Sequence, residues 1–177
     1  MKKYAIIVAG GSGTRFGSTL PKQFVPLGGV PVLMRTIKAF ADYDRDINIV
    51  VALPSEHLTL WGDLCALRNF DVPHKVVEGG ANRFESVRNA LFAVNETECL
   101  VAVHDGARPL VSRQVIAAGF ETAARCGTAI PTVPVTLYLL QSITPVTCDQ
   151  PLSVAGVADD TIGHFFPSPV GIIPCNV

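Results

Sequence analysis

A glycine-rich segment near the amino terminus holds the residues best suited to chemistry in this chain. An anion would be bound there by backbone N–H groups, which glycines leave accessible because they carry no Cβ. Two cations, Arg15 and Lys22, lie in and just after the segment. Together these features predict a polyphosphate site formed by Ala9, Gly10, Gly11, Ser12, Gly13, Thr14, Arg15 and Lys22.

Two common phosphate-binding loops do not match this segment. The dinucleotide pattern G-x-G-x-x-G requires a glycine where this chain has Phe16. A P-loop requires a Gly-Lys-Ser or Gly-Lys-Thr tripeptide, which the chain lacks. The alternative to a binding site is a plain turn with surface cations, and Arg15 together with the P-K-Q tripeptide around Lys22 favours binding.

Two further polar segments follow short apolar runs. One contains Gly79, Gly80, Arg83 and Ser86, and the other is the run H-D-G-A-R-P, which includes His104, Asp105 and Arg108. In an open α/β sheet the ligand binds outside the carboxyl ends of the strands. We therefore expect the three polar segments to meet at one edge of a sheet.

The elements that must position these residues alternate along the chain. Apolar runs at residues 4–9, 47–53, 75–78 and 100–103 predict strands, and helical spacing appears at residues 32–40, 58–68, 83–93 and 113–125. In the helix expected at residues 58–68, Leu60, Leu64 and Leu67 should share the buried face, and Gly127 should end the last helix. This alternation is typical of an α/β fold with a mostly parallel sheet.

The run A-G-G-S-G-T-R-F-G followed by P-K-Q-F resembles the signature of sugar-nucleotide pyrophosphorylases. Its spacing is most similar to that of the 2-C-methyl-D-erythritol 4-phosphate cytidylyltransferase family. The resemblance implies a three-layer α/β/α, Rossmann-like nucleotidyltransferase fold. It also implies transfer of CMP from CTP to 2-C-methyl-D-erythritol 4-phosphate with release of pyrophosphate. Ribitol-5-phosphate cytidylyltransferases share much of the pattern, so another polyol or sugar phosphate is the alternative acceptor.

The resemblance also implies roles for single residues. Arg15 would contact the β- and γ-phosphates of CTP, Lys22 the α-phosphate and Arg108 the acceptor phosphate, and these three are the expected catalytic residues. Asp105 would bind Mg²⁺, although Asp-Gly is also a common turn dipeptide. His104 should orient or pack rather than act as a base. CTP would be bound by Ala9, Gly10, Gly11, Ser12, Gly13, Thr14, Gly79, Gly80, Arg83 and Ser86.

Two of the expected CTP-binding residues keep a structural alternative. Ser86 either reads the cytosine edge or bonds a free N–H group at the start of a helix. Arg83 either reaches a phosphate or supports the loop.

The resemblance covers about residues 2–135, and the remainder of the chain differs in character. The last basic residue is Arg125, and the family's dimer arm, second metal-binding aspartate and acceptor-binding lysine are not recognisable after Val135. We therefore expect a CTP-binding domain at residues 1–135 and an atypical tail at residues 136–177. A reading-frame shift near Thr136 and natural divergence both remain open as its origin. An inactive CTP-binding remnant is accordingly the alternative to a working enzyme, and the family's homodimer is uncertain here.

Composition excludes some classes of protein. A net charge of −1 gives no basic surface for nucleic acid, and no long apolar run or signal-peptide core suggests a membrane or secreted protein. The five cysteines have no C-x-x-C pairing, so reduced thiols in the cytoplasm are expected rather than disulfides or zinc.

Overall fold

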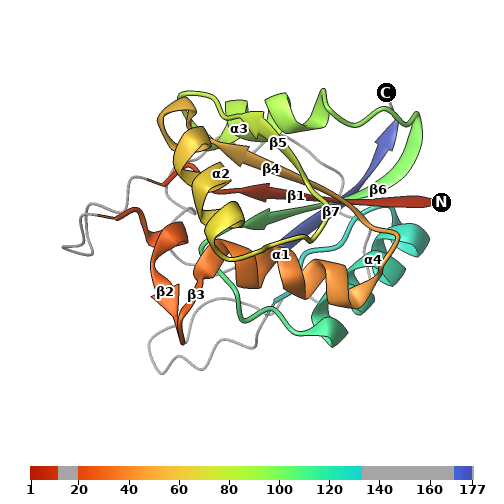
Figure 1. Cartoon of the computed structure of the whole chain (residues 1–177). Helices are drawn as coiled ribbons and strands as arrows, with labels where there is room; N and C mark the ends of the chain where they lie inside the picture. Colours follow the sequence, from red (N-terminus) through yellow and green to blue (C-terminus); the bar gives the residue numbers. More distant parts are fainter. Residues whose placement is uncertain (12–19, 133–169, 177) are drawn as a thin grey trace, which may run out of the picture. The chain divides into compact units, whose positions relative to one another are not determined.

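A computed structural model describes residues 1–11, 20–132 and 170–176 of the chain. Its central feature is a five-stranded sheet in the order β5-β4-β1-β6-β7 (Figure 1). The first four of these strands pair in parallel, and β7 pairs with β6 in the antiparallel direction. The strands span Lys2–Val8 (β1), Asn48–Leu53 (β4), Lys75–Glu78 (β5), Glu98–Asp105 (β6) and Val170–Asn176 (β7).

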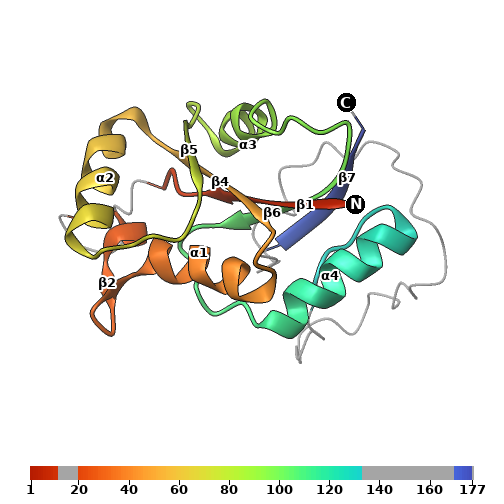
Figure 2. The ribbon, with the colours of Figure 1, turned by 45° about the vertical axis from the view of Figure 1, so that its right-hand side comes forward.

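Helices cover both faces of this sheet, which gives the expected three layers (Figures 1 and 2). Side chains of α1, α2 and α4 pack in one core cluster on one face, and those of α3 pack in a second cluster on the other. The helices span Val32–Tyr43 (α1), Leu58–Leu67 (α2), Arg83–Leu91 (α3) and Arg113–Cys126 (α4), with short 3-10 turns at Lys22–Phe24 (η2) and Ser55–His57 (η3).

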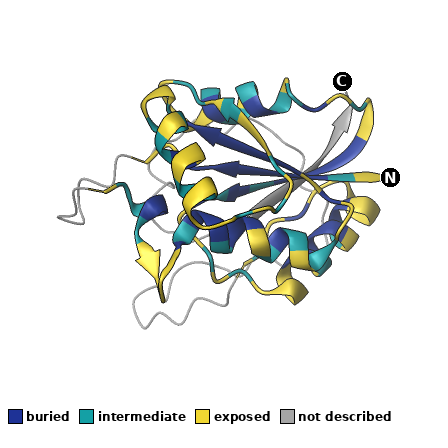
Figure 3. Ribbon diagram, in the orientation of Figure 1, coloured by how far each residue is buried: buried dark blue, intermediate teal, exposed yellow. Residues whose placement is uncertain are grey.

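Strand β1 lies at the centre of the core because it is apolar on both faces. Ala5 and Ile7 pack toward α1 and α4, while Ile6 packs toward α3. All three are fully buried, as the dark central strands of Figure 3 illustrate. A strand covered on both faces by helices needs such a continuous apolar run, which explains why the run was visible in the sequence.

A small hairpin follows η2 and pairs Pro26–Leu27 (β2) with Val30–Pro31 (β3). Its turn requires positive φ angles of 56° at Gly28 and 79° at Gly29, which glycine adopts without strain. Arg35 of α1 donates to the Leu27 carbonyl at 2.7 Å, and Arg68 donates to the Gly29 carbonyl at 2.7 Å. These two bonds attach the hairpin to the helices on one face of the sheet.

The ends of the helices follow their sequence signals. Gly127 caps α4 with φ of 86°, as expected from its position after Arg125. At the other end of α4, Ser112 Oγ accepts a hydrogen bond from the Val115 amide at 3.2 Å. No helix in residues 1–11, 20–132 and 170–176 has the length and apolar character that crossing a membrane requires.

Two sequence expectations need correction or extension. The expectation that Leu67 lies on the buried face of α2 is wrong, because its side chain is 74% exposed and Trp61 is the buried residue of that helix. The strand β7 was not expected, and it adds an antiparallel edge to the sheet from within the atypical tail. Residues 1–131 and β7 belong to one compact unit, and the proposed boundary at residue 135 stays a prediction.

Candidate functional site

A cavity of about 890 Å³ opens at the carboxyl edge of the parallel strands. This volume is within the range of small-molecule binding sites. The expected polar segments that the structure describes border it together, as the sequence predicted. The expected site residues that line it are Ala9, Gly10, Gly11, Lys22, Gly80, Arg83, Ser86, Asp105 and Arg108.

Among the expected site residues that the structure describes, Gly79 alone does not line the cavity. Its amide donates to the Leu53 carbonyl at 2.7 Å. Its neighbour Ser86 leaves little room there, since a Cβ at Gly79 would lie 3.0 Å from the Ser86 hydroxyl. The other four, Ser12, Gly13, Thr14 and Arg15, lie outside the described residues.

The start of α3 holds the Gly79–Gly80 segment in a fixed conformation. Asn82 caps the helix, its Oδ1 accepting from the Glu85 amide at 2.9 Å, and Glu85 Oε2 accepts from the Ala81 amide at 2.8 Å. Such reciprocal bonds at a helix start satisfy free N–H groups. Gly80 is required here because a Cβ at this position would lie 2.2 Å from the Glu85 Cβ.

Ser86 connects the helix to the loop. The hydroxyl donates to the Asn82 carbonyl at 2.9 Å and accepts from the Gly80 amide at 3.1 Å. Its side chain is buried and borders the cavity. The structural role that the sequence left open for Ser86 is therefore present, and its contact with a base stays a prediction.

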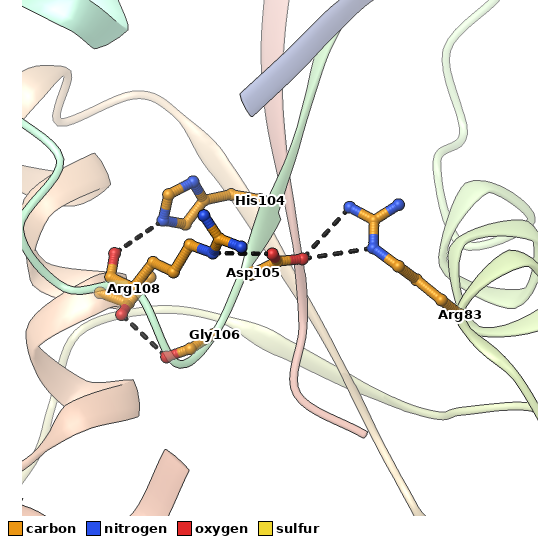
Figure 4. Close-up of polar contacts among 6 residues, drawn as sticks. Arg83, His104, Asp105, Gly106 and Arg108 are labelled. Atoms are coloured by element: carbon orange, nitrogen blue, oxygen red, sulfur yellow. Dashed lines mark hydrogen bonds and ion pairs between the residues drawn. The ribbon is translucent and has the colours of Figure 1, made fainter. Parts of the chain in front are cut away.

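Asp105 lies between two arginines at the end of β6 (Figure 4). Its Oδ1 accepts from Arg83 Nε and Nη2, both at 3.2 Å, and its Oδ2 is 3.0 Å from Arg108 Nε. Arg83, at the start of α3, therefore forms an ion pair with the carboxylate at the end of β6 that is expected to bind metal. The trio combines two positive charges with one negative charge, so it remains attractive to an anion.

The loop that follows Asp105 is fixed to the first strand and to α1. Gly106 donates its amide to the Val8 carbonyl at 2.8 Å and accepts from Thr36 Oγ1 at 2.9 Å. His104 is fully buried, and its Nε2–H donates to the Arg108 carbonyl at 2.8 Å (Figure 4). This geometry matches the orienting role expected for His104.

Lys22 reaches the cavity from the 3-10 turn η2. The next residue, Gln23, is 2% exposed and donates from Nε2 to the Ala9 carbonyl at 2.8 Å. This bond ties the turn to the end of β1. In the sequence Gln23 is recognisable only as part of the P-K-Q motif, and its structural role could not be predicted because it depends on the burial of its side chain.

The charged groups around the described part of the cavity favour a polyanion. Lys22, Arg83 and Arg108 supply three cations, and Asp105 is the single carboxylate among the described lining residues. Within the described residues no group of three or more potential metal ligands occurs. One carboxylate fits a Mg²⁺ ion that arrives with the phosphates of a nucleotide, because Mg²⁺ in such sites takes one or two carboxylates and phosphate oxygens.

Comparison with known proteins agrees with this geometry. The family model described as "IspD: 2-C-methyl-D-erythritol 4-phosphate cytidylyltransferase" matches residues 4–147. A 2-C-methyl-D-erythritol 4-phosphate cytidylyltransferase of Azobacteroides pseudotrichonymphae is 49% identical over 135 residues, which cover 76% of this chain and 60% of that relative. The protein of the same name from Porphyromonas gingivalis is 50% identical over 135 residues, with the same coverage of 76% and 60%.

A solved structure gives the same picture. The crystal structure of 2-C-methyl-D-erythritol 4-phosphate cytidylyltransferase from Thermus thermophilus is 35% identical, with a TM-score of 0.58, over 77% of this chain and 56% of that one. The chain spans about 60% of the length of the curated relatives that it matches. The family match and the identity of these relatives lead to one conclusion: the chain belongs to the 2-C-methyl-D-erythritol 4-phosphate cytidylyltransferase family.

Proposed function

We propose that this protein transfers CMP from CTP to 2-C-methyl-D-erythritol 4-phosphate and releases pyrophosphate, a step that supplies isoprenoid precursors. The observation that carries the proposal is the cavity at the carboxyl edge of the sheet. A glycine segment, Lys22 and the Asp105–Arg108 loop meet there in a chain of this family. The names of the relatives supply the substrate, and the cavity supplies groups that suit a triphosphate.

The reaction requires alignment and charge neutralisation rather than a covalent intermediate. The acceptor phosphate is itself the nucleophile, and attack on the α-phosphorus of CTP breaks the bond to the pyrophosphate leaving group. We assign Lys22 to the α-phosphate, where charge develops in the transition state. Arg15 is assigned to the β- and γ-phosphates, and Arg108 to the acceptor phosphate.

Recognition of cytosine is assigned to the loop before α3. Gly80 borders the cavity, and neither Gly79 nor Gly80 has room for a side chain, because a Cβ would lie 3.0 Å from the Ser86 hydroxyl at Gly79 and 2.2 Å from the Glu85 Cβ at Gly80. Ser86 supports this loop through the Gly80 amide. We propose that backbone groups of this loop, with the Ser86 hydroxyl, distinguish cytosine from other bases.

The proposed cofactor is Mg²⁺, with Asp105 as its protein ligand. The ion would neutralise charge on the triphosphate of CTP. Because Asp105 pairs with Arg83 and Arg108, we propose that Arg83 exchanges part of this contact for phosphate oxygens of CTP, and Arg108 for oxygens of the acceptor phosphate. Arg83 therefore combines the two roles that the sequence left as alternatives, support of the loop and contact with phosphate.

The location, the partners and the oligomeric state of the protein are also proposals. We expect the cytoplasm as the location, in keeping with the free thiols of Cys65 and Cys126. CTP and a polyol phosphate are the proposed partners, and the family's homodimer remains a hypothesis. The described residues that line the cavity all precede Val135.

The experiment is a coupled assay of pyrophosphate release with CTP, Mg²⁺ and a panel of acceptors. We expect release with 2-C-methyl-D-erythritol 4-phosphate and none when the acceptor is omitted. Release only with ribitol 5-phosphate would support the alternative acceptor. Binding of Mg·CTP without release for any acceptor would identify the chain as a nucleotide-binding remnant and refute the proposed reaction.

A further inference from the structure

An aromatic cluster lies against the turn that carries Lys22. In η2, Lys22 borders the cavity, whereas Phe24 is 2% exposed and packs in the core. The Phe24 ring stacks on Trp61 of α2, with ring centroids 6.1 Å apart and an interplanar angle of 25°. His57 contacts the same ring edge-on at 5.5 Å. Figure 2 shows α2 beside this turn.

Two hydrogen bonds fix the orientation of the Trp61 ring. The indole N–H donates to His74 Nε2 at 3.0 Å, and the other ring nitrogen, Nδ1, is 2.7 Å from the Val72 carbonyl. Since a carbonyl only accepts, Nδ1 carries the hydrogen and Nε2 is free to accept from Trp61. His74 is thereby held in one tautomer between the segment before β5 and helix α2.

These contacts form a continuous path from His74 through Trp61 and Phe24 to the Lys22 turn. Apolar packing alone would bury the rings but would leave them able to slide and tilt. A directional N–H···N bond at one end of the stack removes that freedom. At the other end the Gln23–Ala9 bond attaches the turn to β1. The Lys22 turn is therefore held on one side by the Phe24–Trp61 stack and on the other by the Gln23–Ala9 hydrogen bond.

We propose that Trp61 and His74 are positioning residues for Lys22, and that their hydrogen bond holds its ammonium group at the place where the α-phosphate reacts. This inference rests on the proposed function only for the identity of the reaction. A displacement of about 1 Å in a catalytic group lowers rates by up to about a hundredfold. The loss of the bond should therefore affect turnover more than the binding of CTP.

The test compares His74→Leu, which removes the acceptor, with His74→Gln, whose amide accepts from Trp61 and donates to Val72. Phe120→Leu on α4 is the control for a disturbed aromatic core, because Phe120 is 2% exposed and stacks on Tyr43 instead of on the rings beside the Lys22 turn. For His74→Leu we expect kcat to fall about tenfold with KM for CTP changed less than about twofold. His74→Gln should recover most of kcat, and Phe120→Leu should leave it unchanged.

Two readouts separate positioning from a general loss of stability. In a Lys22→Ala background, His74→Leu should have almost no further effect on kcat, because residues that act through one another are not additive. The Phe24 and Val25 amides donate to the Pro21 and Lys22 carbonyls within the turn. Their hydrogen exchange should accelerate about tenfold in His74→Leu but not in His74→Gln or Phe120→Leu. Exchange in α4 should not change.

Independent, multiplicative effects of the His74 and Lys22 substitutions would overturn the proposal, as would unchanged exchange of the Phe24 and Val25 amides in His74→Leu. If the parent protein releases no pyrophosphate, the proposed function fails. The exchange measurement then decides the positioning claim by itself.

Discussion

Replacing Gly106 by alanine should destabilise the fold and move the loop that carries Asp105 and Arg108. A Cβ at this position would lie 2.8 Å from the Ala9 Cβ, 3.1 Å from Leu33 Cδ1 and 3.3 Å from the Val8 carbonyl oxygen. Favourable carbon–carbon contacts lie at about 3.5–4.0 Å. The loop must therefore shift by several tenths of an ångström against a central strand and α1.

The size of the effect follows from two opposing contributions. Overpacking of a rigid core costs about 1–3 kcal/mol. Alanine also reduces the conformational freedom of the unfolded chain, which returns about 0.4–1 kcal/mol. We expect a net loss of about 1–2 kcal/mol in the free energy of unfolding, measured by urea denaturation, together with weaker binding of Mg·CTP because Asp105 and Arg108 move with the loop.

Gly62→Ala is the matched control for this substitution. Gly62 lies inside helix α2, and a Cβ there would meet nothing within 4 Å. The same chemical change should therefore stabilise the protein, by about 0.5–1 kcal/mol, through helix propensity. A Gly106→Ala variant as stable as the parent would contradict the packing argument, and so would a Gly62→Ala variant that loses as much stability as Gly106→Ala.

Three other substitutions have defined outcomes. Lys22→Ala should lower kcat about a hundredfold or more with little change in the affinity for CTP, as for removal of one preorganised electrostatic group, and steady-state kinetics with an unchanged kcat would remove Lys22 from the mechanism. Asp105→Asn should raise the Mg²⁺ concentration required for CTP binding in calorimetry, because a neutral amide attracts the ion less, and an unaltered Mg²⁺ dependence would exclude Asp105 as a ligand. Asp44→Asn should cost about 0.5–1 kcal/mol at neutral pH, since the hydrogen bond from Lys3 at 2.7 Å lowers the pKa of Asp44 below 3.8. Because the pKa of Asp44 is lower in the folded protein than in the unfolded chain, its stabilising effect is present above the unfolded pKa and is lost on acidification. The difference in unfolding free energy between Asp44→Asn and the parent, measured in urea, should therefore vanish at pH values well below 3.8. A difference that persists there would refute the ion pair as its cause.

The sequence was sufficient for the core of the fold because the strands there are buried on both faces. The apolar run at β1 and the helical spacing of α1 and α4 specify their partners through packing alone. Leu67 was misassigned because α2 has apolar residues around much of its circumference, so periodicity could not distinguish Leu67 from Trp61. Strand β7 was not predicted because its seven residues include a glycine and a proline, and both residues are unfavourable inside a strand.

The candidate site was predictable to the level of its segments rather than its contacts. Strand ends of a parallel sheet converge, so the gathering of Gly10, Gly80 and Asp105 around one cavity followed from topology. The Arg83–Asp105 pair joins residues 22 positions apart on different elements, and no local pattern encodes such a contact. The same holds for the bond between Trp61 and His74, which depends on how α2 packs against the segment before β5.

Locating bound Mg·CTP by amide chemical shifts is the most direct test of the central claim that this cavity is the nucleotide site. We predict saturable shifts for the amides of Gly10, Gly80 and Arg108, and none for Gly127 at the far end of α4. We also predict that UTP competes poorly with CTP. Saturable binding that shifts amides away from the cavity, or an absence of binding at millimolar Mg·CTP, would show that this cavity is not the nucleotide site.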